Sequence, residues 1–276
     1  MAMSIRTNIA SLNAQRNLYN TQNTLDSSLS RLSSGFRITK AGDDAAGLGI
    51  STKLESQIRS YSQAVRNAND GISVIQSTES ALNEQANVLT RLRELAMQSA
   101  SDGVGDSERA YVQKESTALV AELQRISQVT EYNGTKLLNG ANATLDFQVG
   151  IYSTTNDAIS FTTLNATTGT AGLNVSGMSM ASKASALAAL ASVDSALASV
   201  SSARADLGAN GNRFASAISN IQSFAESLSA ANSRIKDVDV AEETSRMSRS
   251  QILLQAGVSV LAQANQMPQM ALKLLG

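Results

Sequence analysis

Apolar residues recur with a seven-residue period along two long stretches of the chain. Steps of four and three residues lead from Leu54 to Leu89 and meet an apolar side chain at ten of eleven positions. A second series, from Leu190 to Ile235, meets a polar residue or a glycine at only three positions. A shorter third run consists of Val112, Leu119, Leu123 and Ile126. This period predicts long helices whose apolar stripes pack against one another as in a coiled coil.

Between the third run and the second series lies a segment of different character, residues 133–181, which is rich in Thr, Gly, Asn and Ser. Apolar and polar residues alternate in Thr144–Val149 and in Ala158–Thr162, which predicts two short strands. The pair Asn139-Gly140 lies nearby and is typical of a hairpin turn. The sequence therefore predicts a mainly α fold, with long paired helices forming coiled-coil-like rods and a small β-hairpin region in the middle of the chain.

Each end of the chain is predicted to form a further helix. The N-terminal helix spans Ile5–Ser34, and Gly35 follows at the position where helices commonly end in a left-handed residue. The C-terminal helix begins after Asp239, which together with Glu242 resembles the N-cap and the N3 acid of a capping box. It runs toward Leu275. Because the two helices are similar in length, we expect them to pair.

The C-terminal helix is unusually apolar, since Lys273 is the only charged residue from Ser250 to Gly276. Its apolar residues form two overlapping stripes: Leu254, Val258 and Leu261, and Leu253, Val260, Met267 and Leu274. One N-terminal helix cannot cover both stripes, so we expect further copies of the chain to do so. The residues predicted to carry this assembly are Ile5, Ile9, Leu12, Leu25, Leu29, Leu32, Leu253, Leu254, Val258, Leu261, Met267 and Leu274.

A second candidate contact surface follows the first apolar series. Because Leu89 and Ala96 continue the inward-facing stripe, Arg91, Leu95 and Gln98 are predicted to lie together on the outer face of the helix. An outward leucine beside an arginine suggests a contact surface. The alternative is an ordinary solvated helix face.

The composition excludes most catalytic chemistry. The chain has no His and no Cys, which rules out Ser-His-Asp triads, the His-based zinc protease motif, disulfides and thiol nucleophiles. Its net charge of -1 offers no basic patch for nucleic acid. Asp43 and Asp44 are interpreted as N-caps at a helix start, and Asp102–Asp106 as a turn between two helices rather than a calcium loop. We therefore expect no enzyme, no cofactor and no metal.

Neither a cleavable signal peptide nor a membrane span is predicted. Residues 1–20 contain no uninterrupted apolar core. The longest apolar stretch, Ile252–Ala262, is interrupted by Gln255 and Ser259 and is too short to cross a bilayer. A membrane-active helix at the C-terminus is an alternative of a different class, but its many glutamines make insertion costly. The membrane is therefore not expected as a partner.

Several short segments match the motifs of one family in the order in which they occur. They are Asn8–Arg16, Leu29–Arg37, Gly42–Leu48, Asn69–Ser73, Glu131–Asn139, Arg234–Asp239, Ile252–Ala256 and Ala264–Gln269. On these segments the chain resembles bacterial flagellin. The resemblance implies a D0 domain made of residues 1–42 and 239–276, and a D1 domain of residues 43–238 that includes the small β region 133–181. It implies no outer D2 or D3 domain.

The resemblance also implies a function and a set of partners. The chain would polymerise into the flagellar filament for motility after unfolded export through the flagellar type III apparatus; a hook-filament junction protein of the same family is the alternative. Its partners would be other copies of itself, an export chaperone at the C-terminal helix, the export apparatus, the filament cap and the hook-associated proteins. Arg91, Leu95, Gln98 and Glu115 would contact neighbouring subunits and the vertebrate innate-immune flagellin receptor.

Overall fold

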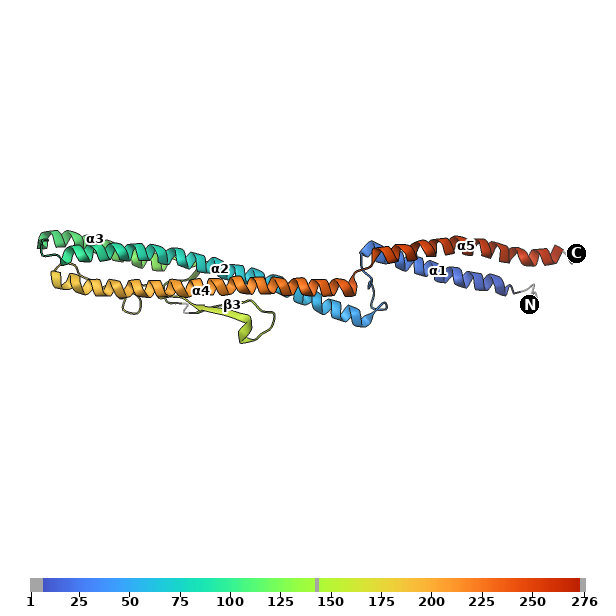
Figure 1. The fold of residues 1–276 in the computed structure, drawn as a ribbon, viewed down its shortest axis with the longest axis horizontal. Coiled ribbons are helices and arrows are strands. Elements are labelled where there is room, and N and C mark those ends of the chain that lie inside the picture. Colours follow the sequence, from blue (N-terminus) through green and yellow to red (C-terminus); the bar gives the residue numbers. More distant parts are fainter. Residues whose placement is uncertain (1–6, 142–143, 274–276) are drawn as a thin grey trace. The chain divides into compact units, whose positions relative to one another are not determined.

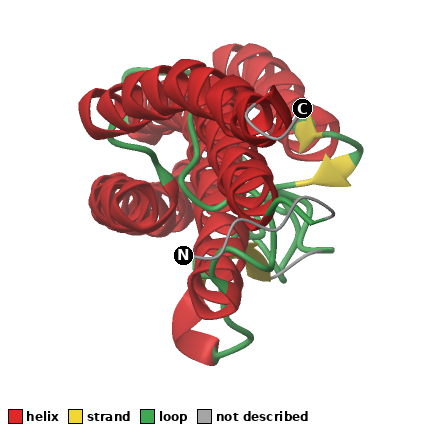
Figure 2. Ribbon diagram, turned by 90° about the vertical axis from the view of Figure 1, so that its right-hand side faces the viewer, coloured by secondary structure: helices red, strands yellow, loops and turns green. Residues whose placement is uncertain are grey.

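The computed structural model describes residues 7–141 and 144–273, with side chains as far as Gln266. Its helices are α1 (Ile9–Ser34), α2 (Ala45–Ala100), α3 (Asp106–Val129), α4 (Lys183–Lys236) and α5 (Val240–Lys273). Its strands form two antiparallel pairs, β1 (Glu131–Tyr132) with β2 (Thr135–Lys136), and β3 (Thr144–Gln148) with β4 (Ala158–Thr162). Figure 2 shows how far helix outweighs strand. The predicted fold class is confirmed.

The chain divides into two compact units. The terminal unit consists of Met1–Ile58 and Glu226–Gly276, and the central unit of Arg59–Ala225. The long helices α2 and α4 each contribute to both units. The buried apolar cluster of the chain extends from Ala64 to Ile221, so that the central unit has a hydrophobic core of its own.

In the central unit, α2 and α4 lie side by side and run in opposite directions (Figure 1). Tyr61 stacks on Phe224 with ring centres 6.3 Å apart, and farther along the pair Arg93 forms a 2.7 Å ion pair with Asp194. Every position of the apolar series on α4 is buried or half-buried, and on α2 only Glu79 is exposed. The prediction that these stripes pack together is confirmed.

The β3-β4 hairpin packs onto this helix pair through aromatic rings. Phe147 on β3 stacks on Phe161 on β4 with ring centres 5.9 Å apart, and it meets Phe214 of α4 edge-on at 5.7 Å. Phe214 in turn lies against Gly71 of α2, where a Cβ atom would be 2.8 Å from the ring. A glycine is therefore needed at position 71, because any larger residue would displace a fully buried phenylalanine.

The two predicted strands are confirmed, but their turn is not where the sequence suggested it. Asn139-Gly140 does not connect β3 to β4, which are joined by a longer loop that contains a 3-10 turn, η1 (Thr155–Asp157). The two-residue turn is instead Asn133-Gly134, between β1 and β2. Both of its residues have positive φ, 49° and 79°, as a type I′ turn requires.

Glutamine side chains attach the irregular segment 163–182 to the helices. Gln85 of α2 is fully buried and donates to the carbonyls of Leu123 and Ala166, both at 3.3 Å. Gln124 of α3 accepts hydrogen bonds from the amide and the hydroxyl of Thr168, both at 2.9 Å. These bonds satisfy backbone groups that a buried loop would otherwise leave without a partner.

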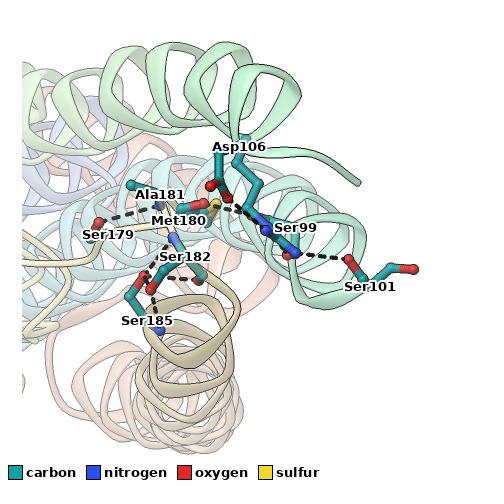
Figure 3. Close-up of polar contacts among 9 residues, drawn as sticks. Ser99, Ser101, Asp106, Ser179, Met180, Ala181, Ser182 and Ser185 are labelled. Atoms are coloured by element: carbon teal, nitrogen blue, oxygen red, sulfur yellow. Dashed lines mark hydrogen bonds and ion pairs between the residues drawn. The ribbon is translucent and has the colours of Figure 1, made fainter. Parts of the chain in front are cut away.

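The turn between α2 and α3 is closed by a buried arginine. Arg109 of α3 donates from Nε to the carbonyl of Ser99 and from Nη2 to that of Ser101, both at 3.0 Å, which caps the C-terminus of α2. Beside it, the Ser99 hydroxyl donates to the Met180 carbonyl at 2.5 Å (Figure 3). The interpretation of Asp102–Asp106 as a turn between two helices is confirmed.

In the terminal unit, α1 and α5 lie side by side (Figure 1). Gly35 ends α1 with φ 75°, as predicted. The Asp239 carboxylate caps α5 by accepting hydrogen bonds from the amides of Ala241 and Glu242. Only half of the predicted capping box is present, because the Glu242 side chain pairs with Arg246 one turn along the helix at 2.6 Å.

The two segments that connect these terminal helices to α2 and α4 pair with each other. Phe36 and Asp237 form an antiparallel bridge, and the Arg37 amide donates to the Lys236 carbonyl at 2.6 Å. The Lys236 ammonium lies 4.4 Å from the centre of the Phe36 ring and 2.5 Å from a carboxylate oxygen of Glu55. Lys236 thus links the two connecting segments to Glu55, near the start of α2.

Only one of the two paired carboxylates before α2 caps the helix, so the prediction that both are N-caps is wrong for Asp43. Asp44 accepts a hydrogen bond from the Gly47 amide at 2.8 Å and caps α2. Asp43 instead accepts bonds from the amides of Thr39 and Lys40 and from the Thr39 hydroxyl, at 3.0 to 3.1 Å. Because these donors favour the charged form, the pKa of Asp43 lies below its ordinary value.

Among the described residues, α4 is the one helix that is long and apolar enough to cross a membrane by length and composition, with a mean hydropathy of 1.4 in its most apolar window. Alanine is responsible for much of this value. Most large apolar side chains of α4 belong to the packed series, whereas Leu187 and Phe224 lie outside it and are exposed. The hydropathy therefore largely reflects the packed face of this helix.

Candidate assembly surfaces

The inner face of the α1-α5 pair is narrow and made largely of small residues. Leu25 and Ser28 of α1 and Ala264 of α5 are buried, and Leu254 and Leu261 are half-buried. At Gly257 a Cβ atom would lie 2.9 Å from Leu18, so the two helices approach closely there. A small contact of this kind buries only part of the apolar surface that α5 carries.

The remaining apolar side chains of the pair are exposed. On α5, Ile252, Leu253, Val258 and Val260 are 53% to 67% exposed, and on α1 so are Ile9, Leu12 and Leu29 at 49% to 64%. Burying the exposed half of seven such side chains is worth on the order of 5–10 kcal/mol before the cost of association. No charged residue lies between Ser250 and Met270, so covering this stretch desolvates no charge.

The structure divides the twelve residues predicted to carry assembly into three groups. Leu25, Leu32, Leu254 and Leu261 are buried or half-buried within the α1-α5 pair, whereas Ile9, Leu12, Leu29, Leu253 and Val258 are exposed. Ile5, Leu274 and the side chain of Met267 lie outside the described residues. Two exposed residues of the same stretch, Ile252 and Val260, were not among the predicted twelve, although Val260 lies in one of the two predicted stripes.

A buried ion pair in the terminal unit was not expected from the sequence. The side chain of Glu243 is 6% exposed and faces the Arg31 guanidinium at 3.9 Å, and the same guanidinium lies 3.7 Å from Asp43. Arg31 therefore connects α1 to α5 and to the loop before α2. No sequence signal indicated this, because Glu243 is about 200 positions from the other two residues.

The second candidate surface differs from its prediction at one residue. Arg91, Gln98 and Glu115 are exposed, but Leu95 is only 1% exposed, so the prediction that it points outward is wrong. The reason is that the buried face of α2 is wider here than one heptad stripe. Val88, Leu92 and Leu95 are buried in addition to Leu89 and Ala96 of the predicted stripe.

The exposed part of this second surface is an ion-paired polar patch. The Arg91 guanidinium is 2.9 Å from Glu94 on the same helix and 2.8 Å from Glu115 on α3. Its hydrogen bonds to Glu94 and to Glu115 raise the pKa of Arg91 above its ordinary value. The patch thus offers hydrogen-bonding groups with no exposed leucine among them.

Comparison with known proteins identifies relatives along both ends of the chain. Residues 5–143 match the family model described as the bacterial flagellin N-terminal helical region, and residues 190–275 match the bacterial flagellin C-terminal helical region. Flagellin D of Vibrio cholerae is 37% identical over a 378-residue alignment that covers 100% of each chain. A flagellin of Halalkalibacterium halodurans is 41% identical over 273 residues, covering 99% of this chain and 100% of the relative.

Proposed function

The chain belongs to the bacterial flagellin family, and from this membership we propose that the exposed apolar surface of α1 and α5 is what joins one copy to the next. As a flagellin it is a structural subunit of the flagellar filament, an extracellular structure that serves motility. Relatives aligned over their whole length are named flagellins, so the comparisons favour a filament subunit over a hook-filament junction protein.

The observation that carries the proposal is the uncharged, half-exposed apolar surface of α5. Ile252, Leu253, Val258 and Val260 are large side chains that α1 leaves uncovered. Exposed apolar surface of this extent is typical of an interaction site. Because identical chains present identical surfaces, repeated contacts between copies generate a ring or a helical polymer.

The D0 and D1 domains follow as part of the proposal. D0 would comprise residues 1–42 and 239–276, which are α1, α5 and their connecting segments, and D1 would comprise residues 43–238. The independent core of the central unit supports a separate D1. The alignment with Vibrio cholerae flagellin D supports the absence of D2 and D3. It extends over 378 residues and covers all of both chains, so this relative contains segments that the present chain of 276 residues lacks.

The same surface supports the proposed export partners. A chaperone that covers the apolar face of α5 would prevent assembly inside the cell, since an amphipathic helix laid into an apolar groove is a common mode of recognition. A chain with no Cys can be exported unfolded through the flagellar type III apparatus and refold without forming disulfides. The filament cap and the hook-associated proteins would then contact subunits at the two ends of the polymer.

The polar patch of Arg91, Gln98 and Glu115 is proposed as a contact between neighbouring subunits and as a surface for the vertebrate innate-immune receptor. Its exposure and its ion pairs support this assignment. Leu95 is not part of the surface, since its side chain is buried in the core of the central unit.

Two substitutions on α5 test the main proposal. In the variant Leu253→Ser/Val260→Ser we expect monomer helicity and melting temperature to be unchanged, because both side chains are already exposed, while elongation from filament seeds is lost. Val129→Ser, which alters an equally exposed residue at the end of α3, is the control and should elongate normally. Normal elongation of the double variant, followed by light scattering and electron microscopy, would contradict the proposal.

A further inference from the structure

Three asparagines in the chain precede a glycine: Asn133, Asn139 and Asn210. An Asn-Gly step is the dipeptide most prone to spontaneous deamidation, because glycine has no side chain to hinder attack by its own amide nitrogen on the asparagine side chain. In an unfolded chain the three steps are chemically alike. The folded structure places each of them in a different environment.

Asn133-Gly134 lies in the most open of these environments. The two residues are exposed and form the whole of the β1-β2 turn. In a two-residue hairpin the ladder joins the flanking residues, here Tyr132 and Thr135, so the Gly134 amide is not part of it. A Cβ atom placed on Gly134 would have no atom within 4 Å beyond the glycine itself and its two chain neighbours, which leaves room for a ring to form there.

The other two steps are restrained. Asn210-Gly211 lies within the 54-residue helix α4, where the glycine amide is part of the helical hydrogen-bond series and the Asn210 side chain donates to the Asp206 carbonyl at 2.9 Å. Asn139 accepts a hydrogen bond from the Ala141 amide, and a Cβ atom on Gly140 would be 2.7 Å from Asn165. Reaction at Asn210 requires local unfolding of the helix, and reaction at Asn139 requires its side chain to leave the Ala141 amide.

We propose that Asn133 is the principal site of spontaneous deamidation in the folded protein. The Gly134 amide nitrogen loses its proton to solvent base and attacks Cγ of Asn133, forming an N–Cγ bond; Nδ2 leaves as ammonia after taking up a proton. Water then opens the resulting succinimide. Cleavage of the new N–Cγ bond gives aspartate, and cleavage of the original backbone C–N bond gives isoaspartate. The net change is the addition of one water and the loss of one ammonia.

The reaction alters both charge and backbone in the hairpin. Asn133 lines a groove together with Asp70 of α2, so the product adds a second carboxylate to the lining of this groove. The isoaspartyl product also adds a methylene to a turn of only two residues, which is incompatible with the β1-β2 register. Deamidation is therefore expected to loosen this hairpin from α2 as the protein ages.

The test is incubation of the purified full-length monomer in mildly alkaline buffer, with peptide mapping by mass spectrometry over time. We expect Asn133 to deamidate more than about tenfold faster than Asn210, because helix opening must precede reaction at Asn210. Asn139 should be slower than Asn133. In concentrated urea the rates at the three sites should become similar, since their dipeptides are identical. The variant Asn133→Gln should remove the dominant product.

Two outcomes would overturn the assignment. The first is a rate at Asn210 or Asn139 that equals or exceeds the rate at Asn133 in the folded protein. The second is a preference for Asn133 that persists unchanged in urea, because the preference would then come from the neighbouring sequence and not from the fold. Neither outcome bears on filament assembly, which is measured separately.

Discussion

Glu79 and Arg204 are the charged residues that interrupt the apolar series of α2 and α4, and their side chains face each other at 3.9 Å. Glu79 is exposed and Arg204 is half-buried, and the pair contributes little stability, about 0–1 kcal/mol. Its effect is on register. A slip of one heptad between the antiparallel helices would separate the two charges. Polar residues at seam positions of coiled coils specify register in the same way.

Leu95 shows where the sequence could not predict a residue's environment. A seven-residue period identifies one buried stripe, but it does not reveal how many elements pack around it. The side chains of Val88 and Leu95 lie off that stripe and are nevertheless buried. The packing of α3 and the irregular segment on α2 depends on contacts such as those of Gln85 and Arg109, which join residues distant in sequence and leave no periodic signal.

Substitution at Leu95 should therefore act on the stability of the monomer. We expect Leu95→Ala to lower the free energy of unfolding by about 2–5 kcal/mol, because it removes a fully buried leucine and leaves a cavity. Urea denaturation of the monomer, followed by circular dichroism, measures this change. Met97→Ala, two residues along the same helix at a 55% exposed position, should change it by less than about 0.5 kcal/mol. Equal, small effects of both substitutions would mean that Leu95 is not in the core.

At the scale of elements, the helices, their caps and the two strands were predictable because their signals are local. Periodicity, Gly35 at a helix end, and Asp44 and Asp239 at helix starts all act within a few residues. The pairing of the connecting segments was not predictable. The bridge between Phe36 and Asp237 joins residues about 200 positions apart, and neither residue carries a pattern that indicates its partner.

The loop before α2 should respond to pH through Asp43. Hydrogen bonds from the Thr39 and Lys40 amides hold the pKa of Asp43 below its ordinary value in the folded protein. A depressed pKa contributes stability that is fully present above the ordinary value and is lost as the pH falls through the folded value. The order of this loop should therefore be constant at neutral pH and decrease only in acid.

Amide chemical shifts measure this titration directly. We expect the Thr39 and Lys40 resonances to shift together, with a midpoint below the ordinary pKa of an aspartate. The variant Asp43→Asn, which retains an acceptor oxygen but cannot ionise, should abolish the titration. A midpoint at or above the ordinary value would show that these hydrogen bonds do not stabilise the carboxylate.

At the scale of the whole molecule, the core and the proposed assembly surface belong to different parts of the chain. The core from Ala64 to Ile221 lies within the central unit, whereas the exposed apolar residues of α5 lie within the terminal unit. Such a division lets a subunit fold its core independently of the contacts that join it to others. It also predicts that removing the chain end separates the two properties.

Deletion of residues 252–276 should leave a soluble, largely helical monomer that cannot polymerise. The central unit retains its core, so we expect a cooperative thermal transition close to that of the intact chain. Helix content should fall by more than the deleted residues, because the first half of α1 loses the part of α5 that Asn8, Ser11 and Leu18 contact, and short isolated helices are marginal in water. Circular dichroism and seeded elongation measure the two effects. Filaments from the truncated chain would place the assembly contacts outside α5, whereas loss of the thermal transition would show that the central unit depends on the chain ends.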